Sequence, residues 1–272
     1  MSEIFPVGLR KTKRRKVVAE FEDGQAEVDE QYIIERDQLR ELGLVLPSDM
    51  MESEGGEDSN DRWKAVRKAT DHDVLQAELN QEEADKAISE AQQLAEKRSL
   101  PMKIIGAEYS FQKSQLRFYF KAPHRVDFRG LVKALARSYS TRIELEQVGP
   151  REAASILGGR GHCGQELCCR RFLYDPGPVP MDFAEKQGIS VSPERITGVC
   201  GRLTCCLQYE LEDYVARLEE LPEKGSRVDS PMGKGKVIKR NVQKETVRVK
   251  LGQEEVEEFD AGEVEVIEDS KG

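Results

Sequence analysis

The sequence predicts an α+β fold, in which an α-β-β-α-β domain is followed by a cysteine-rich module and a small C-terminal β-barrel. Three observations predict it. A helical pattern starting near residue 71 gives way to runs of period two, all six cysteines lie between positions 163 and 206, and short glycine-punctuated runs fill residues 222–268. Helices and strands mixed in one stretch leave a sheet face for helices to cover, which is typical of compact α+β domains.

The first part of the chain, residues 1–46, is expected to be a divergent β-rich region. Val17-Val18-Ala19-Glu20-Phe21 and Tyr32-Ile33-Ile34 are strand candidates, and Asp23-Gly24 is a turn between them. Residues 47–61 carry six acids and no Lys or Arg, together with Gly55-Gly56. This composition predicts a solvated acidic linker.

Residues 62–150 predict the α+β domain itself. Apolar positions with helical spacing indicate a helix over about residues 71–97, ended by Pro101. Period-two patterning then predicts strands over 102–110 and 115–122, joined by a turn at 112–114. Asp127 is a candidate cap for a second helix, and residues 141–148 return as a strand. The order of these elements is α-β-β-α-β.

Residues 151–210 form a six-cysteine module built from a repeat. Cys163, Cys168 and Cys169 belong to one C-G-x-x-x-C-C motif, and Cys200, Cys205 and Cys206 repeat it with an offset of 37 residues at all three positions. Adjacent residues of a strand point to opposite faces, and on a helix they lie about 100° apart. One cysteine of each vicinal pair is therefore better placed for a given metal. The simplest ligand set is Cys163, Cys200 and one cysteine from each pair.

Four thiolates suit either a tetrahedral zinc ion or an iron–sulfur cluster. A C-x₄-C gap is wide for a zinc knuckle and also occurs in plant-type iron–sulfur proteins, so the residues alone leave both open. Flanking arginines are candidates to offset thiolate charge, and glycines directly after Cys163 and Cys200 let a backbone N–H approach a sulfur. These arginines are Arg160, Arg170, Arg171, Arg195 and Arg202.

Charge and composition bound the function. The chain of 272 residues has a net charge of −9, which argues against an overall nucleic-acid-binding coat. From Arg10 to Lys16 six of seven residues are basic, which makes this run a candidate for weak RNA contact. No apolar stretch approaches the roughly 18–20 residues of a membrane span, and no signal-peptide core is present. We expect a cytoplasmic protein and, since no catalytic pattern is visible, no enzyme.

Residues 222–268 predict a separate barrel of short strands resembling SH3-like barrels. Gly225, Gly233, Gly235 and Gly252 separate its short runs. Its final stretch, residues 254–269, carries nine acids and no Lys or Arg, which disfavours a nucleic-acid role for that edge.

The sequence resembles the PSP (polymerase suppressor protein) C-terminal-domain family, in particular its bacterial RicT/YaaT-like regulators. The resemblance spans about residues 62–210, and residues 233–237 resemble the family more loosely. The matching motifs are AEYSF at 107–111, LRFYF at 116–120, RVDFRGLV at 125–132, TRIEL at 141–145, GGxG at 158–161, SPxRIxG at 192–198, and the two cysteine triplets.

This resemblance implies a non-enzymatic regulator in a complex that carries 4Fe–4S clusters. It implies RicA- and RicF-like small helical partners and an action on ribonuclease Y-dependent mRNA processing, with effects on sporulation. It also implies that Cys163, Cys168, Cys169, Cys200, Cys205 and Cys206 are the candidate ligands.

Two other classes of function remain open at this point. One is a zinc-stabilised RNA-binding protein that uses the basic run and the module's arginines. The other is a thiol oxidoreductase, which the absence of a C-x-x-C motif disfavours.

Overall fold

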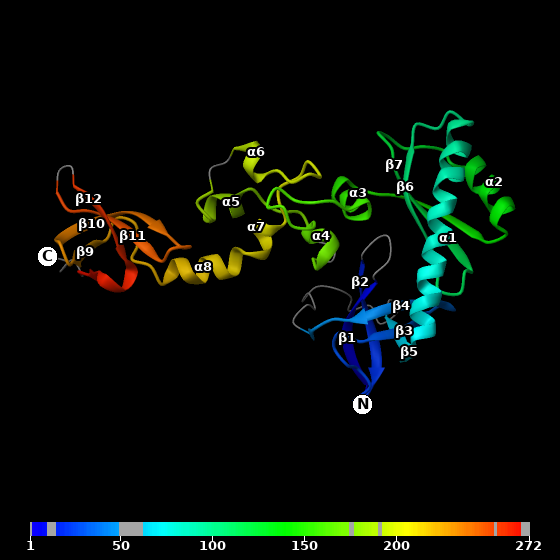
Figure 1. Ribbon diagram of the computed structural model, residues 1–272, viewed down its shortest axis with the longest axis horizontal. Coiled ribbons are helices and arrows are strands. Elements are labelled where there is room, and N and C mark those ends of the chain that lie inside the picture. The colour runs from blue at the N-terminus through cyan, green and yellow to red at the C-terminus, as the bar shows by residue number, and fades with distance from the viewer. Residues whose placement is uncertain are drawn as a thin grey trace. The chain divides into compact units, whose positions relative to one another are not determined.

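The computed structural model describes residues 2–9, 15–48, 62–173, 177–189, 192–252 and 255–267. The chain is a mixed α and β protein, as the sequence predicts, and it divides into two compact units (Figure 1). The first unit holds residues 1–177 and 198–202, and the second holds residues 178–197 and 203–272. Among the described helices, none combines the length and the apolar character needed to cross a membrane.

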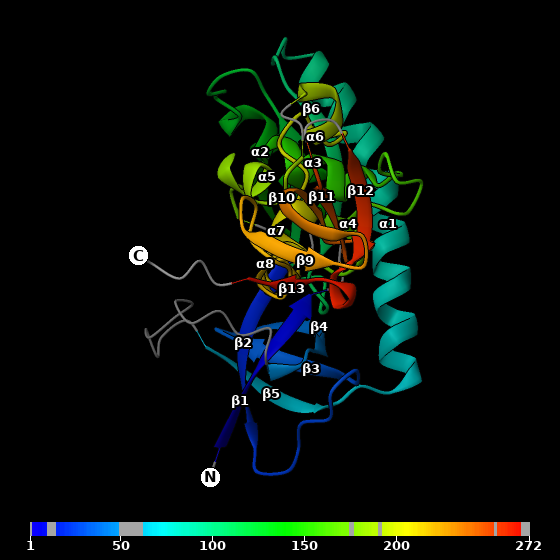
Figure 2. The same cartoon turned by 90° about the vertical axis from the view of Figure 1, so that its left-hand side faces the viewer.

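Five strands close into a barrel at the start of the first unit (Figure 2). Around the barrel they follow the order β1 (Ser2–Leu9), β2 (Arg15–Glu22), β5 (Trp63–Lys68), β3 (Gln31–Arg36) and β4 (Leu39–Val45). Only the β2–β5 pair is parallel among the described pairings of this barrel. Closure leaves no free edge strand for another chain to pair with. The barrel is filled by Val7, Leu9, Phe21, Tyr32, Ile34 and Trp63.

The position of this barrel differs from the expectation in two ways. The closed barrel lies in the N-terminal region, which the sequence predicts to be β-rich but not closed, and the strands predicted to form a barrel at residues 222–268 form the separate five-stranded sheet described below. Strand β5 of the closed barrel also follows the acidic stretch 47–61, so that stretch connects two strands of one barrel; residues 49–61 themselves lie outside the described residues. The sequence pattern does not predict β5, because only Trp63 of its six residues is buried and the strand therefore has no alternation of apolar and polar residues.

The next part of the first unit is a three-stranded sheet with helices on both faces. A helix, α1 (Asp71–Glu96), precedes strands β6 (Lys103–Tyr109) and β7 (Gln115–Lys121), and helix α2 (Arg129–Tyr139) precedes β8 (Arg142–Gln147). Strands β6 and β7 are antiparallel, and β7 and β8 are parallel. These elements follow the α-β-β-α-β pattern read from the sequence. Phe128 takes the N-cap position of α2, one residue later than predicted, and the Asp127 carboxylate accepts a hydrogen bond from the Arg129 N–H, the first of the helix, at 3.1 Å.

The two sheet faces are covered differently. Helices α1 and α2 cover one face, as Figure 1 shows, and bury Leu116, Phe118 and Phe120 together with four alanines of α1. Small alanine side chains let the long helix lie close to the strands. The short helix α3 (Pro150–Leu157) packs against the other face, where Tyr119 is fully buried. The cysteine region follows directly on α3.

The second unit contains short helices and a C-terminal sheet. The helices are α5 (Asp182–Lys186), α6 (Pro193–Ile196), α7 (Cys206–Tyr209) and α8 (Leu211–Glu219). Ala184, Ile196 and Leu207 form a small apolar core between the first three of them. This core is built from residues on both sides of the second cysteine motif.

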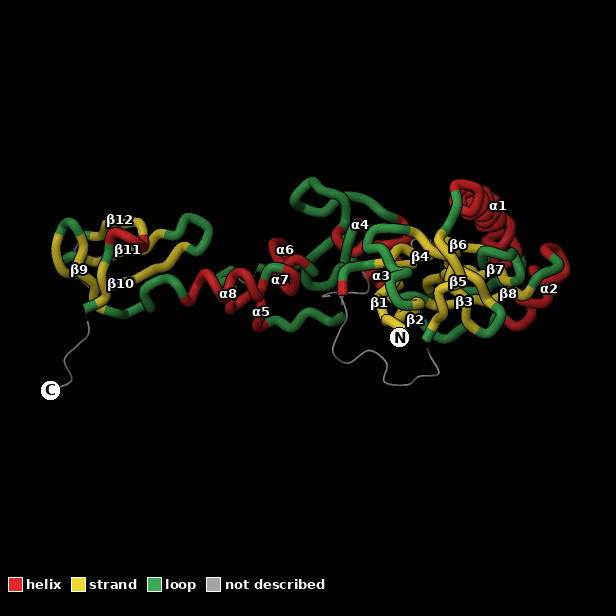
Figure 3. The backbone as a smooth tube through the Cα atoms, turned by 90° about the horizontal axis from the view of Figure 1, so that it is seen from below, coloured by secondary structure: helices red, strands yellow, loops and turns green. Residues whose placement is uncertain are grey.

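The C-terminal sheet has five strands, drawn in yellow in Figure 3. Its order is β12 (Val256–Asp260), β11 (Thr246–Lys250), β10 (Gly233–Asn241), β9 (Arg227–Ser230) and β13 (Glu265–Val266). Five buried valines and Phe259 form its apolar core. Its four described pairings are all antiparallel, as expected for strands joined by short turns.

Candidate metal centre

The first cysteine motif folds into a tight loop followed by one turn of helix. The Gly161 N–H donates to the Gln165 carbonyl at 2.9 Å, and the Gly164 N–H donates back to the Gly161 carbonyl at 2.9 Å. Gly164, directly after Cys163, has a φ of +79°, which L side chains rarely adopt. The loop therefore requires glycine there, and it leads into α4 (Cys168–Arg171).

The second motif folds into the same loop. The Gly198 N–H donates to the Arg202 carbonyl at 2.9 Å, and the Gly201 N–H donates to the Gly198 carbonyl at 2.9 Å. Gly201, directly after Cys200, has a φ of +76°. Each of these residues lies 37 positions after its counterpart in the first loop, so the sequence repeat is also a structural repeat.

The flanks of the two loops repeat as well. An isolated antiparallel bridge joins Arg160 to Glu166 in the first loop and Thr197 to Leu203 in the second. A one-turn helix starts at the vicinal pair in both, at Cys168 in α4 and at Cys206 in α7. Each motif thus presents one cysteine in a glycine turn and a vicinal pair at the start of a helical turn.

The six thiols differ in exposure. Cys163 is exposed, Cys169 is buried, and the other four are partly buried. Cys163 Sγ lies 3.5 Å from where a Cβ on Gly161 would be, so the sulfur folds back over its own loop. The exposed thiol of Cys163 is thus the one that directly precedes Gly164 in the first loop.

Cys169 and Cys200 both belong to the first unit and influence each other. Burial raises the pKa of the Cys169 thiol, and the nearby Cys200 raises it further, while Arg151 acts in the opposite direction. The Ser155 hydroxyl donates to the Cys169 carbonyl at 2.7 Å and fixes the backbone there. A raised pKa favours the neutral thiol over the thiolate.

The donor types fit a thiolate-ligated group, but the thiols do not form a closed site by themselves. Within the described residues, no three Cys, His, Asp or Glu side chains come together in a way that could hold a metal ion. The two matching loops therefore carry the candidate ligands, but within the described residues these ligands are not close enough together to form a metal site.

Two of the five arginines predicted to offset thiolate charge, Arg160 and Arg170, form side-chain hydrogen bonds to the backbone. Arg160 Nη1 donates to the Gly164 carbonyl at 2.8 Å. Arg170 Nη1 donates to the carbonyls of Ser155 and Ile156, both at 3.0 Å, and so caps the end of α3. These two side chains stabilise the first loop and its approach from α3. The side chain of Arg195 lies outside the described residues.

Arg151 is the cation near Cys169 that the sequence analysis missed. Its side chain is 7% exposed, and its Nη1 donates to the Gly177 carbonyl at 2.6 Å. It lies 18 positions before Cys169 along the chain, so no spacing rule connects the two. The folding of α3 brings them together.

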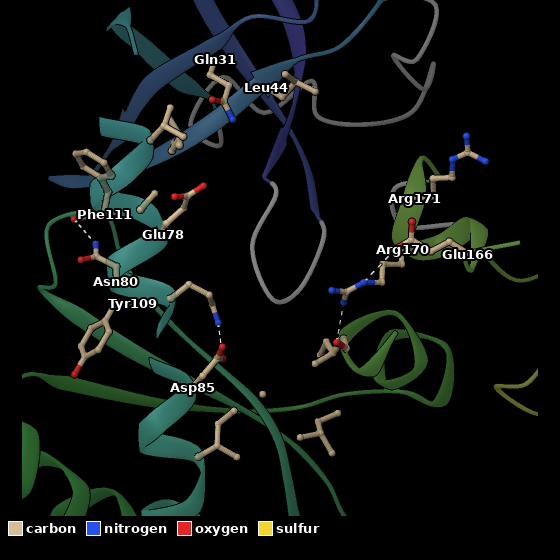
Figure 4. A pocket seen from close by; sticks show the side chains of 18 residues that line it. Gln31, Leu44, Glu78, Asn80, Asp85, Tyr109, Phe111, Glu166, Arg170 and Arg171 are labelled. Carbon is tan, nitrogen blue, oxygen red and sulfur yellow. Dashed lines mark hydrogen bonds and ion pairs between the residues drawn. The ribbon is translucent and has the colours of Figure 1, made fainter. Parts of the chain in front are cut away.

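The first unit also contains a cleft of about 630 Å³ (Figure 4). Glu78, Asn80 and Asp85 of α1 lie on one side of it, and Arg170 and Arg171 of α4 lie on the other. The Asn80 Nδ2 donates a hydrogen bond to the Phe111 carbonyl at 2.9 Å, and Arg170 Nε forms an ion pair with Glu166 Oε1 at 3.4 Å. Several of its polar groups thus serve the internal packing of the unit.

The basic run falls mostly outside the described residues. Arg10 to Arg14 are not among them, whereas Arg15 and Lys16 begin strand β2. Its contact with RNA stays a prediction.

Comparison with known proteins gives matches along most of the chain. Residues 64–148 match the PSP1 C-terminal conserved region, and residues 178–221 match the third domain of PSP1-like proteins. The Stage 0 sporulation protein YaaT of Bacillus subtilis (strain 168) is 38% identical over 221 residues, which cover 81% of this chain and 75% of that protein.

Two yeast proteins share shorter segments. Protein PSP1 of Saccharomyces cerevisiae is 45% identical over 49 residues, 18% of this chain and 6% of that protein. An uncharacterised protein of Schizosaccharomyces pombe is 36% identical over 80 residues, 29% of this chain and 11% of that protein. No solved structure matches.

Proposed function

Because the chain belongs to the PSP1 family and is YaaT-like over most of its length, we propose that it is a non-enzymatic regulatory adaptor that holds an iron–sulfur cluster. The candidate ligands are the six cysteines of the two loops. Four of them serve: Cys163, Cys200, one of Cys168 and Cys169, and one of Cys205 and Cys206. The proposed compartment is the cytoplasm.

The partners follow from the same family resemblance. The proposed adaptor acts with RicA- and RicF-like small helical proteins on ribonuclease Y-dependent mRNA processing. The Bacillus subtilis relative is named for sporulation, and a chain from a cell that does not sporulate can keep the RNA-processing role without that phenotype.

One observation supports the cluster most directly, namely the structural repeat of the two loops. Two copies of one hydrogen-bonded turn each place a cysteine immediately before a glycine of positive φ. The Gly164 and Gly201 N–H groups donate to the Gly161 and Gly198 carbonyls, so these two glycines close the turn that presents each cysteine. Two loops of the same fold can each supply two cysteine ligands to one cluster.

When bound, a cluster would supply a link between the two loops that depends on iron supply and redox state. The chain's own residues prepare the loops for it. Arg160 holds the backbone of the first loop, and Arg170 holds the end of α3 that leads into it. Ser155 holds the Cys169 carbonyl, and Arg151 places a positive charge near the Cys169 thiol. Loss of the link would release the loops and, with them, the surface offered to partners.

Anaerobic purification tests the proposal directly. A visible spectrum and iron, sulfide and zinc analyses are made on the same sample of the full chain. A broad band near 400 nm, roughly where clusters of this class absorb, with iron and sulfide in equal amounts, supports the cluster. One zinc per chain and no sulfide would replace it with the zinc-stabilised RNA-binding alternative.

A second measurement separates the adaptor role from the metal. The anaerobically purified protein is mixed with purified RicA- and RicF-like proteins and with ribonuclease Y, and complexes are resolved by size-exclusion chromatography. Co-elution supports the partner proposal, and separate elution at micromolar concentrations contradicts it. A colourless protein with one rapidly alkylated thiol would instead favour a thiol oxidoreductase.

A further inference from the structure

Helix α8 of the second unit has an apolar face that its own unit does not bury. Four apolar residues follow the spacing i, i+3, i+4 and i+7, which places them on one side of the helix. They are Leu211, Tyr214, Val215 and Leu218. None of the nine residues of α8 is buried, although an amphipathic helix normally turns such a stripe toward a core. The stripe is therefore open to a further element.

The apolar cores of the unit are built without this stripe. Within the described residues of the unit, one core lies among α5, α6 and α7, and another lies inside the C-terminal sheet. The Tyr214 hydroxyl lies 3.7 Å from where a Cβ on Gly188 would be, so Tyr214 contacts its own unit. Leu211, Val215 and Leu218 are only partly buried and belong to neither core. These three side chains are the free part of the stripe.

Both ends of α8 are held in place (Figure 1). The Glu210 N–H donates to the Cys206 carbonyl at 2.9 Å and the Tyr214 N–H donates to the Glu210 carbonyl at 3.0 Å, which joins α8 to α7. At the other end, Arg240 Nη1 of β10 donates to the Leu218 carbonyl at 3.2 Å. The stripe is thus presented by a helix that its own unit fixes at both ends.

The two flanks of the stripe differ in charge. At about 100° per residue, Glu212 and Glu219 lie beside Val215 on one flank. Both carboxylates are exposed, and within the described part of the chain neither forms an ion pair. The other flank carries one acid and one base, Glu210 and Arg217. Uncompensated negative charge therefore lies along one side of the apolar stripe.

We propose that α8 binds an amphipathic helix of another protein, one whose flank carries lysine or arginine. An apolar stripe two turns long matches two turns of a second helix, and Glu212 and Glu219 complement cations on its flank. Residues 210–220 carry five acids and one base, so two copies of α8 would place like charges side by side. This disfavours a second copy as the occupant. The inference rests on the proposed adaptor role and gives the chemistry of one partner.

The test uses two synthetic helical peptides of about 14 residues, close to the shortest length at which isolated helices form. Both have leucine at the spacing of the α8 stripe, and their flanking positions are lysine in one and glutamate in the other. Binding of each fluorescently labelled peptide to the full chain is followed by anisotropy. The salt concentration is about 150 mM, at which exposed charges more than about 8 Å apart are largely screened. The wild-type chain should bind the lysine peptide more tightly.

Removal of the apolar stripe is the first variant. Leu211→Gln/Leu218→Gln should weaken binding of the lysine peptide about tenfold, because two leucines no longer gain burial in the complex. Both side chains are only partly buried in the free chain, so thermal melting should change little.

Reversal of the flank is the second variant. Glu212→Lys/Glu219→Lys should invert the preference, with the two affinities changing about fivefold in opposite directions. Asp213→Lys/Glu220→Lys is the matched control, because it makes the same change of charge on the side of α8 away from the stripe. The control should keep the wild-type preference.

Three results would overturn the inference: no preference of the wild type for the lysine peptide, an equal change of preference in the control, or unchanged binding by Leu211→Gln/Leu218→Gln. A wild-type dimer that this variant dissociates in sedimentation would also overturn it and assign the stripe to a second copy. If the leucine variant melts lower, the flank variants still decide, because all four of their positions are exposed. The peptides require neither the metal nor the proposed partner proteins, so a failure here is distinct from a failure of the cluster or the adaptor role.

Discussion

The Arg67 guanidinium forms a bidentate ion pair with the Asp73 carboxylate, with Nη1 2.6 Å from Oδ2 and Nη2 2.9 Å from Oδ1. Arg67 lies in β5 of the barrel and Asp73 in the first turn of α1. Asp73 Oδ2 also accepts hydrogen bonds from the Thr70 N–H and hydroxyl, at 2.8 and 2.7 Å. One buried carboxylate thus joins the barrel, the helix cap and the start of α1.

Asp73→Asn should therefore destabilise the first unit by about 1–3 kcal/mol at neutral pH, the range for losing a charge-assisted hydrogen bond and weakening a helix cap. Urea unfolding followed by the fluorescence of Trp63, the only tryptophan, measures it. Asp71→Asn is the matched control, because Asp71 is exposed in the same turn and takes no part in the cap. Equal losses in both variants would contradict the assignment.

The same pair predicts a pH dependence. The Arg67 hydrogen bonds, opposed by burial and aided by Thr70, hold the pKa of Asp73 below its usual range. A lowered folded-state pKa stabilises the protein above the unfolded pKa of about 3.9 and loses that stabilisation as the pH falls below it. The difference between wild type and Asp73→Asn should therefore be smaller near pH 3 than at pH 7; a constant difference would exclude the ionic contribution.

Arg117 holds a second buried carboxylate on the sheet. It pairs with Glu108 at 3.4 Å and with Glu144 at 3.0 Å, and the Glu108 side chain is only 4% exposed. Arg117→Gln leaves that carboxylate without its cation and should cost about 3–5 kcal/mol. Urea unfolding followed by circular dichroism measures the loss. Arg142→Gln removes an exposed partner of Glu144 and should cost less than about 1 kcal/mol.

Gly43 is required by the packing of the barrel. A Cβ there would lie 2.3 Å from Val7 Cγ1, the end of a stiff, fully buried side chain. Gly43→Ala should cost about 1–3 kcal/mol through overpacking. Gly130→Ala, in α2 and with only the Arg98 side chain within 4 Å, should be neutral or slightly stabilising. Trp63 fluorescence during urea unfolding distinguishes the two.

Cys163→Ser and Cys200→Ser should each remove the metal centre, because neither has a neighbouring thiol to replace it. Single changes within the vicinal pairs should keep part of the metal. His162→Asn is the control, because His162 is exposed beside Cys163 and is expected to be a bystander. The number of metal ions bound per chain is measured for every variant after anaerobic purification. Full metal content in both leading-cysteine variants would end the four-thiolate scheme.

Periodicity was sufficient to predict the central elements. The helix predicted over 71–97 is α1, and the strand pair at 102–122 has Leu116, Phe118 and Phe120 on its helix-covered face. These elements are long, and their burial follows a simple period. Strands β1, β4 and β5 were not predicted, because Pro6 interrupts β1 and charged residues interrupt the apolar pattern of β4 and β5.

The features of the candidate site also fall into those that the sequence predicts and those that only the folded structure shows. Exact repetition of C-G-x-x-x-C-C predicts two equivalent ligand loops, since equal spacing imposes equal local hydrogen bonding. The burial of Cys169, the approach of Arg151 and the hydrogen bonds of Arg170 to Ser155 and Ile156 depend on α3, which brings residues far apart in the chain together.

The sequence by itself determined the family, the cysteine repeat and the alternation that builds the central sheet, because each is a property of residues close together in the chain. Only the tertiary structure decided which strands close the barrel, which thiol is buried, and that Leu211, Val215 and Leu218 stay outside the apolar cores of their unit. The helical period defines an apolar stripe, but the packing of the neighbouring elements decides whether that stripe is covered.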